Sequence, residues 1–338
     1  MTIEEVGLPA PGPSEATVEV DACAVCHSDV TFWRGGWGGT LPAIYGHEAV
    51  GRISSVGPGT RMAVGQRVLV TLMRSCGDCP SCAGGAPAQC ATPGDHPGLD
   101  GAVAAMNCGA FAEAVTVHQS QLAAVPDTIP PEAAAILSCG VITGLGAVVN
   151  TARVRPGDWC VIIGAGGVGL NAIQAARLAG AARILAVDLS DAKLKAAREF
   201  GATDVALAED GPDALKRLGR LADHVFVTVG AGPVIDGALD WCAPQGTAYL
   251  VGMPHLGTVG HYDPVLLSYY GQGLRGTRMG DVVLRRDMPW ILDLYAQGRL
   301  KLEELVSDVF PLDRINEAFA ETEAGRGRRN VIRIGGPA

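Results

Sequence analysis

A short glycine-rich turn constrains the fold of this chain more than any other feature of its sequence. The segment CVIIGAGGVGLNAIQAARLAG runs from an apolar strand into a G-x-G-x-x-G turn and then into a helix. In such a turn the first glycine (Gly164) allows a tight bend, the second (Gly166) lets the backbone approach a pyrophosphate, and the third (Gly169) lets helix and strand pack closely. The segment therefore predicts a β-α-β unit of a parallel sheet.

An acidic residue follows this turn at the spacing that dinucleotide sites require. Asp188 ends the next predicted strand, about twenty residues further on, where a carboxylate accepts hydrogen bonds from a ribose and repels a 2'-phosphate. Capping of the next helix is the alternative role, but Ser190 and Asp191 already supply capping groups. No arginine follows in DLSDAK. We therefore expect NAD rather than NADP, bound by Asp188 and by the glycines of the turn, which are Gly164, Gly166, Gly167 and Gly169.

The sequence pattern changes twice along the chain. Residues 1–138 carry short, often alternating strands separated by glycine and proline turns, which predicts a β-rich domain. Residues 139–279 alternate apolar runs with helix-period segments, which predicts a nucleotide-binding domain with a doubly wound parallel sheet. Residues 280–338 predict two helices and two strands without a core of their own, so we expect them to return to the first domain. The predicted fold class is α/β.

The charge balance restricts the kinds of partner. The chain has 26 Lys and Arg against 35 Asp and Glu, a net charge of -9, which disfavours nucleic acid and anionic membrane surfaces and leaves a small molecule as the expected partner. The first twenty residues lack the basic start and apolar run of a signal peptide. The long apolar segment 160–187 is interrupted by polar residues such as Asn171 and Arg177, which excludes it as a membrane span. We therefore expect a cytoplasmic protein.

Four closely spaced cysteines predict a structural metal site. The run CGDCPSCAGGAPAQC has the spacing C-x2-C-x2-C-x7-C within a lobe, about residues 74–92, that is rich in Gly, Ala and Pro. Such a lobe cannot bury a core, so four thiolates on one Zn²⁺ are expected to hold its shape. Disulfides fit a reducing compartment poorly, and a ferredoxin-type run has a shorter last gap followed by proline. The expected ligands are Cys76, Cys79, Cys82 and Cys90.

A second set of candidate ligands comes from three separate segments. Cys26, His47 and Cys139 each have an ordinary interpretation as a core residue or surface residue. In a chain that also carries the glycine turn, these three residues form a Cys2His set with an open fourth position, which is the pattern that the catalytic zinc of alcohol dehydrogenase uses. We expect them to meet where the two domains face each other. The neighbouring carboxylates Asp29 and Glu48 are placed to orient His47 or to modulate the metal. Alternatively, Asp29 and Glu48 are carboxylates at the ends of strands, with no role at a metal site.

The order of these motifs carries a resemblance to a known family. CHSD, GHEAVG, the four-cysteine lobe, CGVITGLGAV, GAGGVGL and AVD follow one another as in the zinc-containing medium-chain alcohol dehydrogenases, over nearly the whole chain. The resemblance implies a Rossmann-type domain, a GroES-like catalytic domain with a structural-zinc lobe, two Zn²⁺ per chain, NAD, and a homodimer or homotetramer. It also assigns residues: Ser28 to a proton relay, Thr143 and Val168 to the nicotinamide, Asp188 and Lys193 to the adenosine ribose, and Arg329 to the neighbourhood of the pyrophosphate.

The activity that the resemblance implies is the reversible oxidation of a primary or secondary alcohol to an aldehyde or ketone, through a zinc-bound alkoxide and hydride transfer to NAD. Thr31 stands where many members of the family have a histidine that continues the proton relay. The family usually opens with a further strand, so an incomplete first hairpin is expected. Two other functions stay open: an S-(hydroxymethyl)thiol (formaldehyde-adduct) dehydrogenase of the same family, and a non-catalytic NAD-binding protein.

The loop between Cys26 and His47 predicts a wall of the substrate pocket. It contains Trp33 and Trp37, and glycines at positions 35, 36, 38 and 39 leave little else there to fill space. We expect both tryptophans and Leu72 to line the pocket. Core packing of the tryptophans is the alternative, because large aromatic side chains are usually mostly buried.

Overall fold

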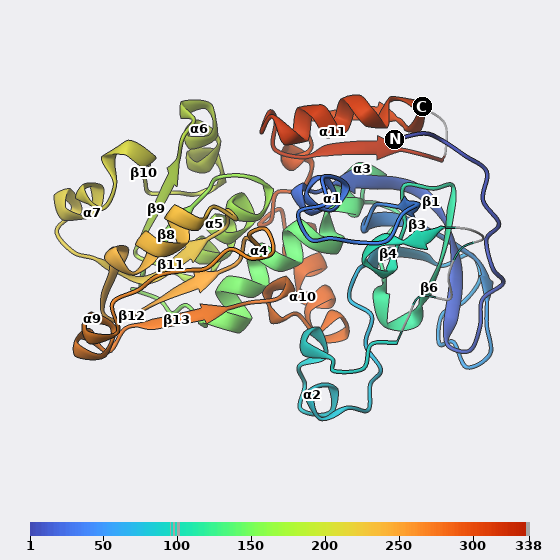
Figure 1. Ribbon diagram of the computed structural model, residues 1–338, viewed down its shortest axis with the longest axis horizontal. Coiled ribbons are helices and arrows are strands. Elements are labelled where there is room, and N and C mark those ends of the chain that lie inside the picture. The colour runs from blue at the N-terminus through green and yellow to red at the C-terminus, as the bar shows by residue number, and fades with distance from the viewer. Residues whose placement is uncertain (95, 97–98, 100–101, 336–338) are drawn as a thin grey trace. The chain divides into compact units, whose positions relative to one another are not determined.

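The computed structural model describes residues 1–94, 96, 99 and 102–335, and the chain divides into two compact units. The first unit combines Met1–Gly140 with Val283–Ala338, and the second is Val141–Val282 (Figure 1). The divisions fall after Gly140 and Val282, two and three residues beyond the boundaries expected from the sequence. Cys139 consequently belongs to the same unit as Cys26 and His47.

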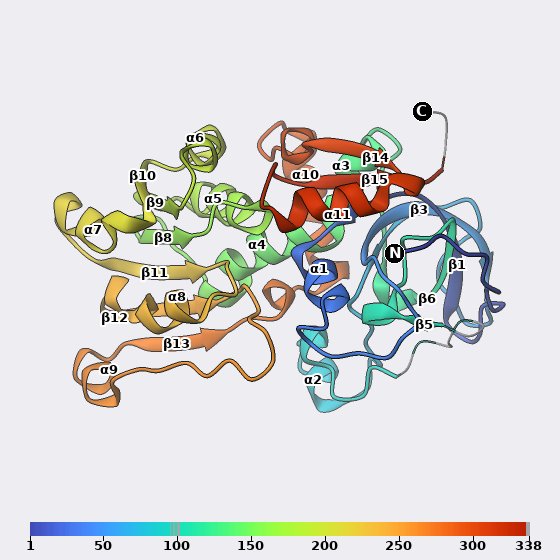
Figure 2. The same cartoon turned by 45° about the horizontal axis from the view of Figure 1, so that its top comes forward.

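One long strand organises the first unit. β1 (Glu15–Val25) pairs antiparallel with β3 (Glu48–Val56), β6 (Ala114–His118) and β15 (Asn330–Arg333). Two register shifts against β3 mark bulges, which bend a strand and let β1 serve several partners. The C-terminal segment thereby lies beside β1 (Figure 2). The strand order of this sheet is β14-β15-β1-β3-β4-β7. Its remaining strands are β4 (Arg67–Thr71), β7 (Leu122–Ala124) and β14 (Asp308–Pro311). Two short strands, β2 (Ala43–Ile44) and β5 (Val103–Ala104), form a separate pair.

Helices pack against this sheet and close its core. Phe319 of α11 is fully buried, and its ring lies edge-on to Phe111 and Trp33. This aromatic contact joins α11 to Trp33 at the end of α1 and to Phe111 in the segment before β6. The helices of the unit are α1 (His27–Trp33), α2 (Pro80–Ala83), α3 (Pro131–Ile136), α10 (Leu284–Ala296) and α11 (Ile315–Glu323), with short helices η1 (Pro87–Gln89), η2 (Ala105–Asn107), η3 (Gln119–Gln121), η9 (Glu303–Leu305) and η10 (Leu312–Arg314).

The second unit is a parallel six-stranded sheet with the order β10-β9-β8-β11-β12-β13 (Figure 1). From β8 the chain moves outward through β9 and β10, and then returns to the other side of β8 with β11. The strands are β8 (Trp159–Ile163), β9 (Arg183–Asp188), β10 (Asp204–Leu207), β11 (Ala222–Val227), β12 (Cys242–Leu250) and β13 (Gly273–Gly276). This reversal creates a switch point between β8 and β11, where ligands of doubly wound sheets bind at the carboxyl edge.

The connections of this sheet are helical. The fully buried side chains of Val161, Val225 and Val227 form its core with the helices that cover it. The helices are α4 (Ile142–Gly146), α5 (Gly167–Ala179), α6 (Asp191–Phe200), α7 (Asp213–Leu218), α8 (Gly232–Asp236) and α9 (Pro264–Tyr270), with η5 (Ala147–Ala152), η6 (Ala208–Asp210), η7 (Gly237–Trp241) and η8 (Met279–Asp281). A further short helix, η4 (Leu137–Val141), spans the division between the two units.

One helical stretch is long and apolar enough to cross a membrane by length and composition. It is Pro131–Ala152, not the segment 160–187 that stands out in the sequence. Of its most apolar 18-residue window, 89% is buried inside the protein. That burial is typical of a core helix, because the apolar side chains already have protein partners.

Candidate metal centres and cofactor site

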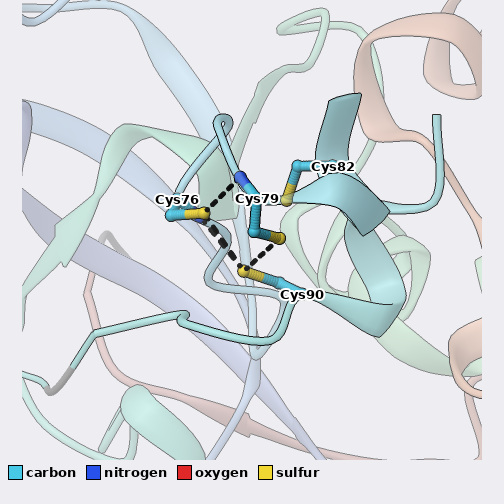
Figure 3. Close-up of side chains that lie close together, drawn as sticks. All are labelled: Cys76, Cys79, Cys82 and Cys90. Carbon is cyan, nitrogen blue, oxygen red and sulfur yellow. Dashed lines mark hydrogen bonds between the residues drawn. The ribbon is translucent and has the colours of Figure 1, made fainter. Parts of the chain in front are cut away.

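The structure brings the four cysteines of the lobe together. Their Sγ atoms all lie within 4.8 Å of one another (Figure 3). The Sγ of Cys90 is 3.6 Å from that of Cys76 and 3.9 Å from that of Cys79. A tetrahedral Zn²⁺ with Zn–S bonds of about 2.3 Å requires sulfur separations of about 3.8 Å. All ten cysteines are free of disulfides, and the separations of 3.6 and 3.9 Å are close to those that one Zn²⁺ requires.

Hydrogen bonds donated to the Cys76 sulfur favour its thiolate form, which is the form that binds a cation. The backbone N–H of Cys79 donates to the Sγ of Cys76 over 3.3 Å, and the Thr92 hydroxyl donates to the same sulfur over 3.4 Å. These hydrogen bonds lower the pKa of Cys76 to about 6, and the bond from Thr92 has the largest effect. Burial instead raises the pKa of Cys82 to about 12. The pKa values of Cys76 and Cys82 are thus shifted in opposite directions, and metal binding would displace the protons that the thiols still carry.

An ion pair fixes the base of the lobe. Arg74, two residues before the first cysteine, donates to the carbonyl of Pro93 at the far end over 3.1 Å and to the Glu15 carboxylate over 3.3 Å. The two side chains are only 12% and 7% exposed. Since Glu15 begins β1, this pair ties both ends of the lobe to the main sheet.

A second cluster lies within the first unit. Ligand atoms of Cys26, His47, Glu48 and Cys139 all lie within 4.8 Å of one another, and all four residues are buried. All three predicted ligands, Cys26, His47 and Cys139, belong to the first unit, because the division falls after Gly140. The structure also adds the carboxylate of Glu48 to the set.

Asp29 fixes the protonation of His47. Its Oδ1 lies 3.0 Å from Nδ1 of His47 and accepts the backbone N–H of Gly46 over 3.1 Å, and its Oδ2 accepts the backbone N–H of Cys26 over 3.0 Å. A carboxylate can only accept, so Nδ1 carries a proton and Nε2 is the ring nitrogen left to bind a metal. Nε2 is buried and has no hydrogen-bond partner among the described residues. A buried, unpaired imidazole nitrogen beside two sulfurs fits a bound Zn²⁺.

The two thiols of this cluster interact directly. A hydrogen bond from Cys139 lowers the pKa of the Cys26 thiol well below its usual range, and the same bond, with burial, raises the pKa of Cys139. A metal requires both sulfurs as thiolates, so its binding would displace any proton that either thiol carries.

Glu48 and Arg329 form an ion pair beside the cluster. Nη2 of Arg329 lies 3.4 Å from Oε1 of Glu48, with side-chain exposures of 8% and 0%. Burial raises the pKa of Glu48 to about 8, although the guanidinium opposes that rise. The Arg329 pKa is raised, chiefly by Glu48 acting against burial. The family resemblance implies a place for Arg329 near a pyrophosphate; the carboxylate beside it in the structure is that of Glu48.

Cys139 lies in the π-helical turn η4 (Leu137–Val141). The preceding residue, Ser138, is fully buried, and its hydroxyl reaches the carbonyls of Ala49 on β3, over 3.1 Å, and of Ala135, over 2.5 Å. Single π-turns inside helices are frequent at functional sites. Here the turn and the Ser138 bond hold Cys139 next to the strand that follows His47.

The glycine turn of the second unit has the geometry that the sequence predicts. Gly164 has φ +98°, which favours glycine. A Cβ on Gly169 would overlap the Gly164 carbonyl, whereas one on Gly166 would meet nothing within 4 Å. The third glycine therefore serves packing and the second faces open space. Gly167 begins α5, whose N-terminus has no side-chain cap, so its N–H groups suit a pyrophosphate.

The remaining cofactor residues surround this turn. Oδ2 of Asp188 accepts the N–H of Ala165 over 2.8 Å and Oδ1 accepts that of Ser190 over 3.1 Å, which joins the end of β9 to the glycine turn. Lys193 is half-buried in α6, and Val168 is half-buried in the first turn of α5. Thr143, in α4, is buried, and its hydroxyl lies 3.6 Å from the Met279 sulfur.

The residues proposed for the proton relay and the pocket lie on or near α1. Ser28 is half-buried in its first turn, and the Thr31 hydroxyl donates to the carbonyl of His27 over 3.0 Å. Trp33 packs edge-on against Phe319, 5.7 Å between centroids, and the half-buried Trp37 packs edge-on against Phe32 at 5.3 Å. Trp33 and Leu72 both pack on the core. For Trp33, core packing is thus the contact that the structure provides.

Comparison with known proteins decides the family. The model of the alcohol dehydrogenase GroES-like domain matches residues 12–127, and that of the zinc-binding dehydrogenases matches residues 167–297. The class-3 alcohol dehydrogenase of Myxine glutinosa is 33% identical over 356 residues, covering 99% of this chain and 94% of that protein. The chain belongs to the zinc-containing medium-chain alcohol dehydrogenase family. An NDMA-dependent alcohol dehydrogenase of Amycolatopsis methanolica is also 33% identical, over 98% of this chain and 94% of that protein.

Solved structures of this family share the fold. Benzyl alcohol dehydrogenase from Acinetobacter calcoaceticus matches with a TM-score of 0.93 at 29% identity, covering 98% of this chain and 95% of that chain. An alcohol dehydrogenase zinc-binding domain protein from Burkholderia ambifaria matches with a TM-score of 0.91 at 32% identity, covering 97% and 94%. The predicted α/β fold, a GroES-like domain with a Rossmann-type domain, is confirmed. The relatives support an oxidoreductase.

Sequence reasoning missed two features of the sites. The first is the Glu48–Arg329 pair, whose members lie far apart in the sequence. The second is a turn at Met279 that contacts Thr143. No local sequence pattern predicts the Glu48–Arg329 pair or the contact of Met279 with Thr143, because each depends on which distant segments the fold brings together.

Proposed function

We propose that this protein catalyses the reversible, NAD-linked oxidation of a primary or secondary alcohol to an aldehyde or ketone. Cys26, His47 and Cys139 would hold the catalytic Zn²⁺, and the four-cysteine lobe would hold a structural one. The observation that carries the proposal is the buried set of two thiols beside the unpaired Nε2 of His47. When bound, the zinc supplies a Lewis acid for the substrate oxygen and NAD supplies the hydride acceptor.

The protein side chains would prepare this chemistry. Asp29 keeps Nδ1 of His47 protonated and leaves Nε2 as the donor atom. Glu48 and Arg329 place a carboxyl group and a guanidinium beside the ligands, 3.4 Å apart, where they could modulate the charge around the metal. Ser28, half-buried two residues after Cys26, is the hydroxyl that would take the alcohol proton.

Cofactor selection would follow from the end of β9. The Asp188 carboxylate would accept the adenosine ribose hydroxyls, with Lys193 beside it, and would repel a 2'-phosphate. The open space before Gly166 and the uncapped start of α5 would receive the pyrophosphate. The pyrophosphate is common to both cofactors, so the preference for NAD rests on the Asp188 carboxylate.

Metal analysis combined with a dehydrogenase assay tests the catalytic assignment. The unmodified protein should contain two Zn²⁺ per chain and reduce NAD with some member of a panel of primary, secondary and aromatic alcohols. Cys26→Ala should lose one Zn²⁺ and all turnover while staying folded. Cys108→Ala is the matched control, because Cys108 is a fully buried cysteine of the same unit outside both ligand sets. Two Zn²⁺ and normal turnover in Cys26→Ala would refute the proposal.

The same assay distinguishes the two alternative functions. Turnover of a formaldehyde–thiol adduct in strong preference to simple alcohols would favour the S-(hydroxymethyl)thiol dehydrogenase. NADH binding without turnover of any substrate would favour a non-catalytic role. We further propose that the protein is cytoplasmic and forms a homodimer or homotetramer. Light scattering after size-exclusion chromatography would test the oligomeric state.

A further inference from the structure

Three consecutive residues of the second unit have left-handed backbone conformations. They are Met279, Gly280 and Asp281, with φ of +51°, +65° and +49°. Residues with a Cβ disfavour this region, and such strain costs about 1 to 3 kcal/mol per residue and clusters at ligand-binding sites. Two of the three positions here carry a side chain. Surrounding contacts must therefore hold the turn.

The turn lies at the edge of the sheet where a dinucleotide binds. β13 (Gly273–Gly276) is parallel to β12, and the turn follows its carboxyl end after two residues. The glycine turn follows the carboxyl end of β8 at the same edge. Since Asp188, on β9, would take the adenosine ribose, the other half of the cofactor would extend across the switch point toward β11, β12 and β13.

The turn packs directly on the helix that carries Thr143. The Met279 sulfur lies 3.6 Å from the Thr143 hydroxyl. Gly280 approaches so closely that a Cβ on it would overlap Gly146 and the Thr143 carbonyl, and a Cβ on Gly146 would overlap the Gly280 carbonyl. The position of Thr143, the residue assigned to the nicotinamide, and that of the turn are therefore coupled.

A chain of hydroxyl groups ends on the third residue of the turn. The Thr151 and Thr277 hydroxyls lie 2.8 Å apart, and the Thr151 hydroxyl lies 2.8 Å from Oδ2 of Asp281. Because a carboxylate only accepts, Thr151 donates to Asp281 and Thr277 donates to Thr151. Arg275 lies 3.5 Å from the same carboxylate and donates to the Thr151 carbonyl over 3.3 Å. Asp281 is thus tied to η5 and to β13.

We propose that Asp281 is a positioning residue for the nicotinamide half of NAD. Its carboxylate holds the left-handed turn Met279–Asp281 against Thr143, and the turn shapes that side of the cofactor site. The inference rests on the proposed function, since it requires that NAD binds. It predicts that loss of the anchor weakens the binding of NADH but not of ADP-ribose, which lacks the nicotinamide.

Equilibrium binding of these two ligands tests the inference. Asp281→Gly relieves the backbone strain but removes the anchor, and Thr151→Val removes only the hydroxyl that donates to it. Both variants should bind NADH about tenfold more weakly, by fluorescence titration, and bind ADP-ribose within about twofold of the unmodified protein, by calorimetry. Asp281→Asn should largely restore NADH binding, because its amide oxygen still accepts and asparagine tolerates positive φ.

Asp213→Asn is the control, because Asp213 is an exposed, ion-paired carboxylate of the same unit and should leave both affinities unchanged. Equal weakening of both ligands in Asp281→Gly, or no weakening, would overturn the inference while leaving NAD binding intact. A purely structural role would lower the melting temperature without separating the two ligands. Failure of the unmodified protein to bind NADH would overturn both this inference and the proposed function.

Discussion

The guanidinium of Arg329 occupies the space that a side chain at position 140 would need. A Cβ on Gly140 would lie well under 3.0 Å from Nη2 of Arg329, closer than real Cβ contacts come. Gly140 directly follows the candidate ligand Cys139, and Arg329 pairs with Glu48 beside the same cluster. Glycine at this position is therefore a condition for the buried ion pair.

Gly140→Ala should displace Arg329 and break its pairing with Glu48. We expect a loss of about 3 kcal/mol in the free energy of unfolding, measured by urea denaturation, because a buried pair would be separated. Gly237→Ala is the control, since a Cβ there meets nothing within 4 Å. In an Arg329→Ala background the Gly140→Ala step should cost far less; an equal cost in both backgrounds would show that the overlap is not the cause.

Cys79→Ser should destabilise the lobe, whereas Cys26→Ala should leave the fold nearly intact. None of the α2 residues is buried, so the lobe depends on its metal for shape. Each variant should contain one Zn²⁺ per chain by metal analysis. Limited proteolysis should cut only Cys79→Ser within residues 74–92. Resistance of the Cys79→Ser lobe to protease would argue that the metal does not hold it.

Asp188→Asn should relax the cofactor preference. Removing the charge removes repulsion of a 2'-phosphate, while the amide oxygen can still accept the N–H of Ala165 or Ser190. We expect the ratio of kcat/KM for NADP to that for NAD to rise by about tenfold. The unmodified enzyme should prefer NAD. An unchanged ratio in Asp188→Asn would remove Asp188 from the ribose site.

The two tryptophans of the loop should behave differently. Trp33 packs on Phe319 and lies under the Arg34 guanidinium, 4.3 Å from it, so Trp33→Ala should mainly destabilise the fold, by about 3 kcal/mol. Trp37→Ala should raise kcat/KM for bulky alcohols relative to short ones by about tenfold, through loss of steric exclusion. Substrate profiles and urea denaturation of both variants would separate these roles. A Trp37→Ala variant that is unstable with an unchanged profile would place Trp37 in the core instead.

Asp287 should make stability depend on pH. Burial alone would raise the pKa of this carboxyl, but hydrogen bonds from Arg286, the Val283 N–H and Trp290 lower it. A lowered folded-state pKa gives stability that is present above the unfolded value, about 3.9, and is lost as the pH falls through the folded value.

We therefore expect Asp287→Asn to cost about 2 kcal/mol at pH 7 and progressively less below about pH 4, by urea denaturation across pH. Asp213→Asn, an exposed carboxylate, should show no measurable cost at either pH. A cost for Asp287→Asn that is constant with pH would mean that its carboxylate charge is not responsible.

Features that are local in sequence could be predicted from the sequence. The glycines at 164, 166 and 169 impose their geometry through backbone conformation and the absence of a Cβ, which need no information from distant residues. The four cysteines of the lobe lie within fifteen residues, so their spacing alone brings them to one cation. The strand, turn and helix pattern likewise indicated a parallel sheet.

The second cluster could be predicted only in part. Residue type and family resemblance identified Cys26, His47 and Cys139, but the pairing of Glu48 with Arg329 beside them depends on the fold. Trp33, predicted for a pocket, packs on Phe319, a residue of a helix nearly three hundred positions away.

By itself, then, the sequence determined the family, the dinucleotide turn and the composition of both ligand sets, since each is written in neighbouring residues or in the kinds of donor atom present. Only the tertiary structure decided that Glu48 lies among the candidate ligand atoms, that Arg329 fits against Gly140 and that Asp281 anchors a turn beside Thr143. These relationships depend on the close packing of segments distant in the chain, and short sequence patterns do not encode which segments meet.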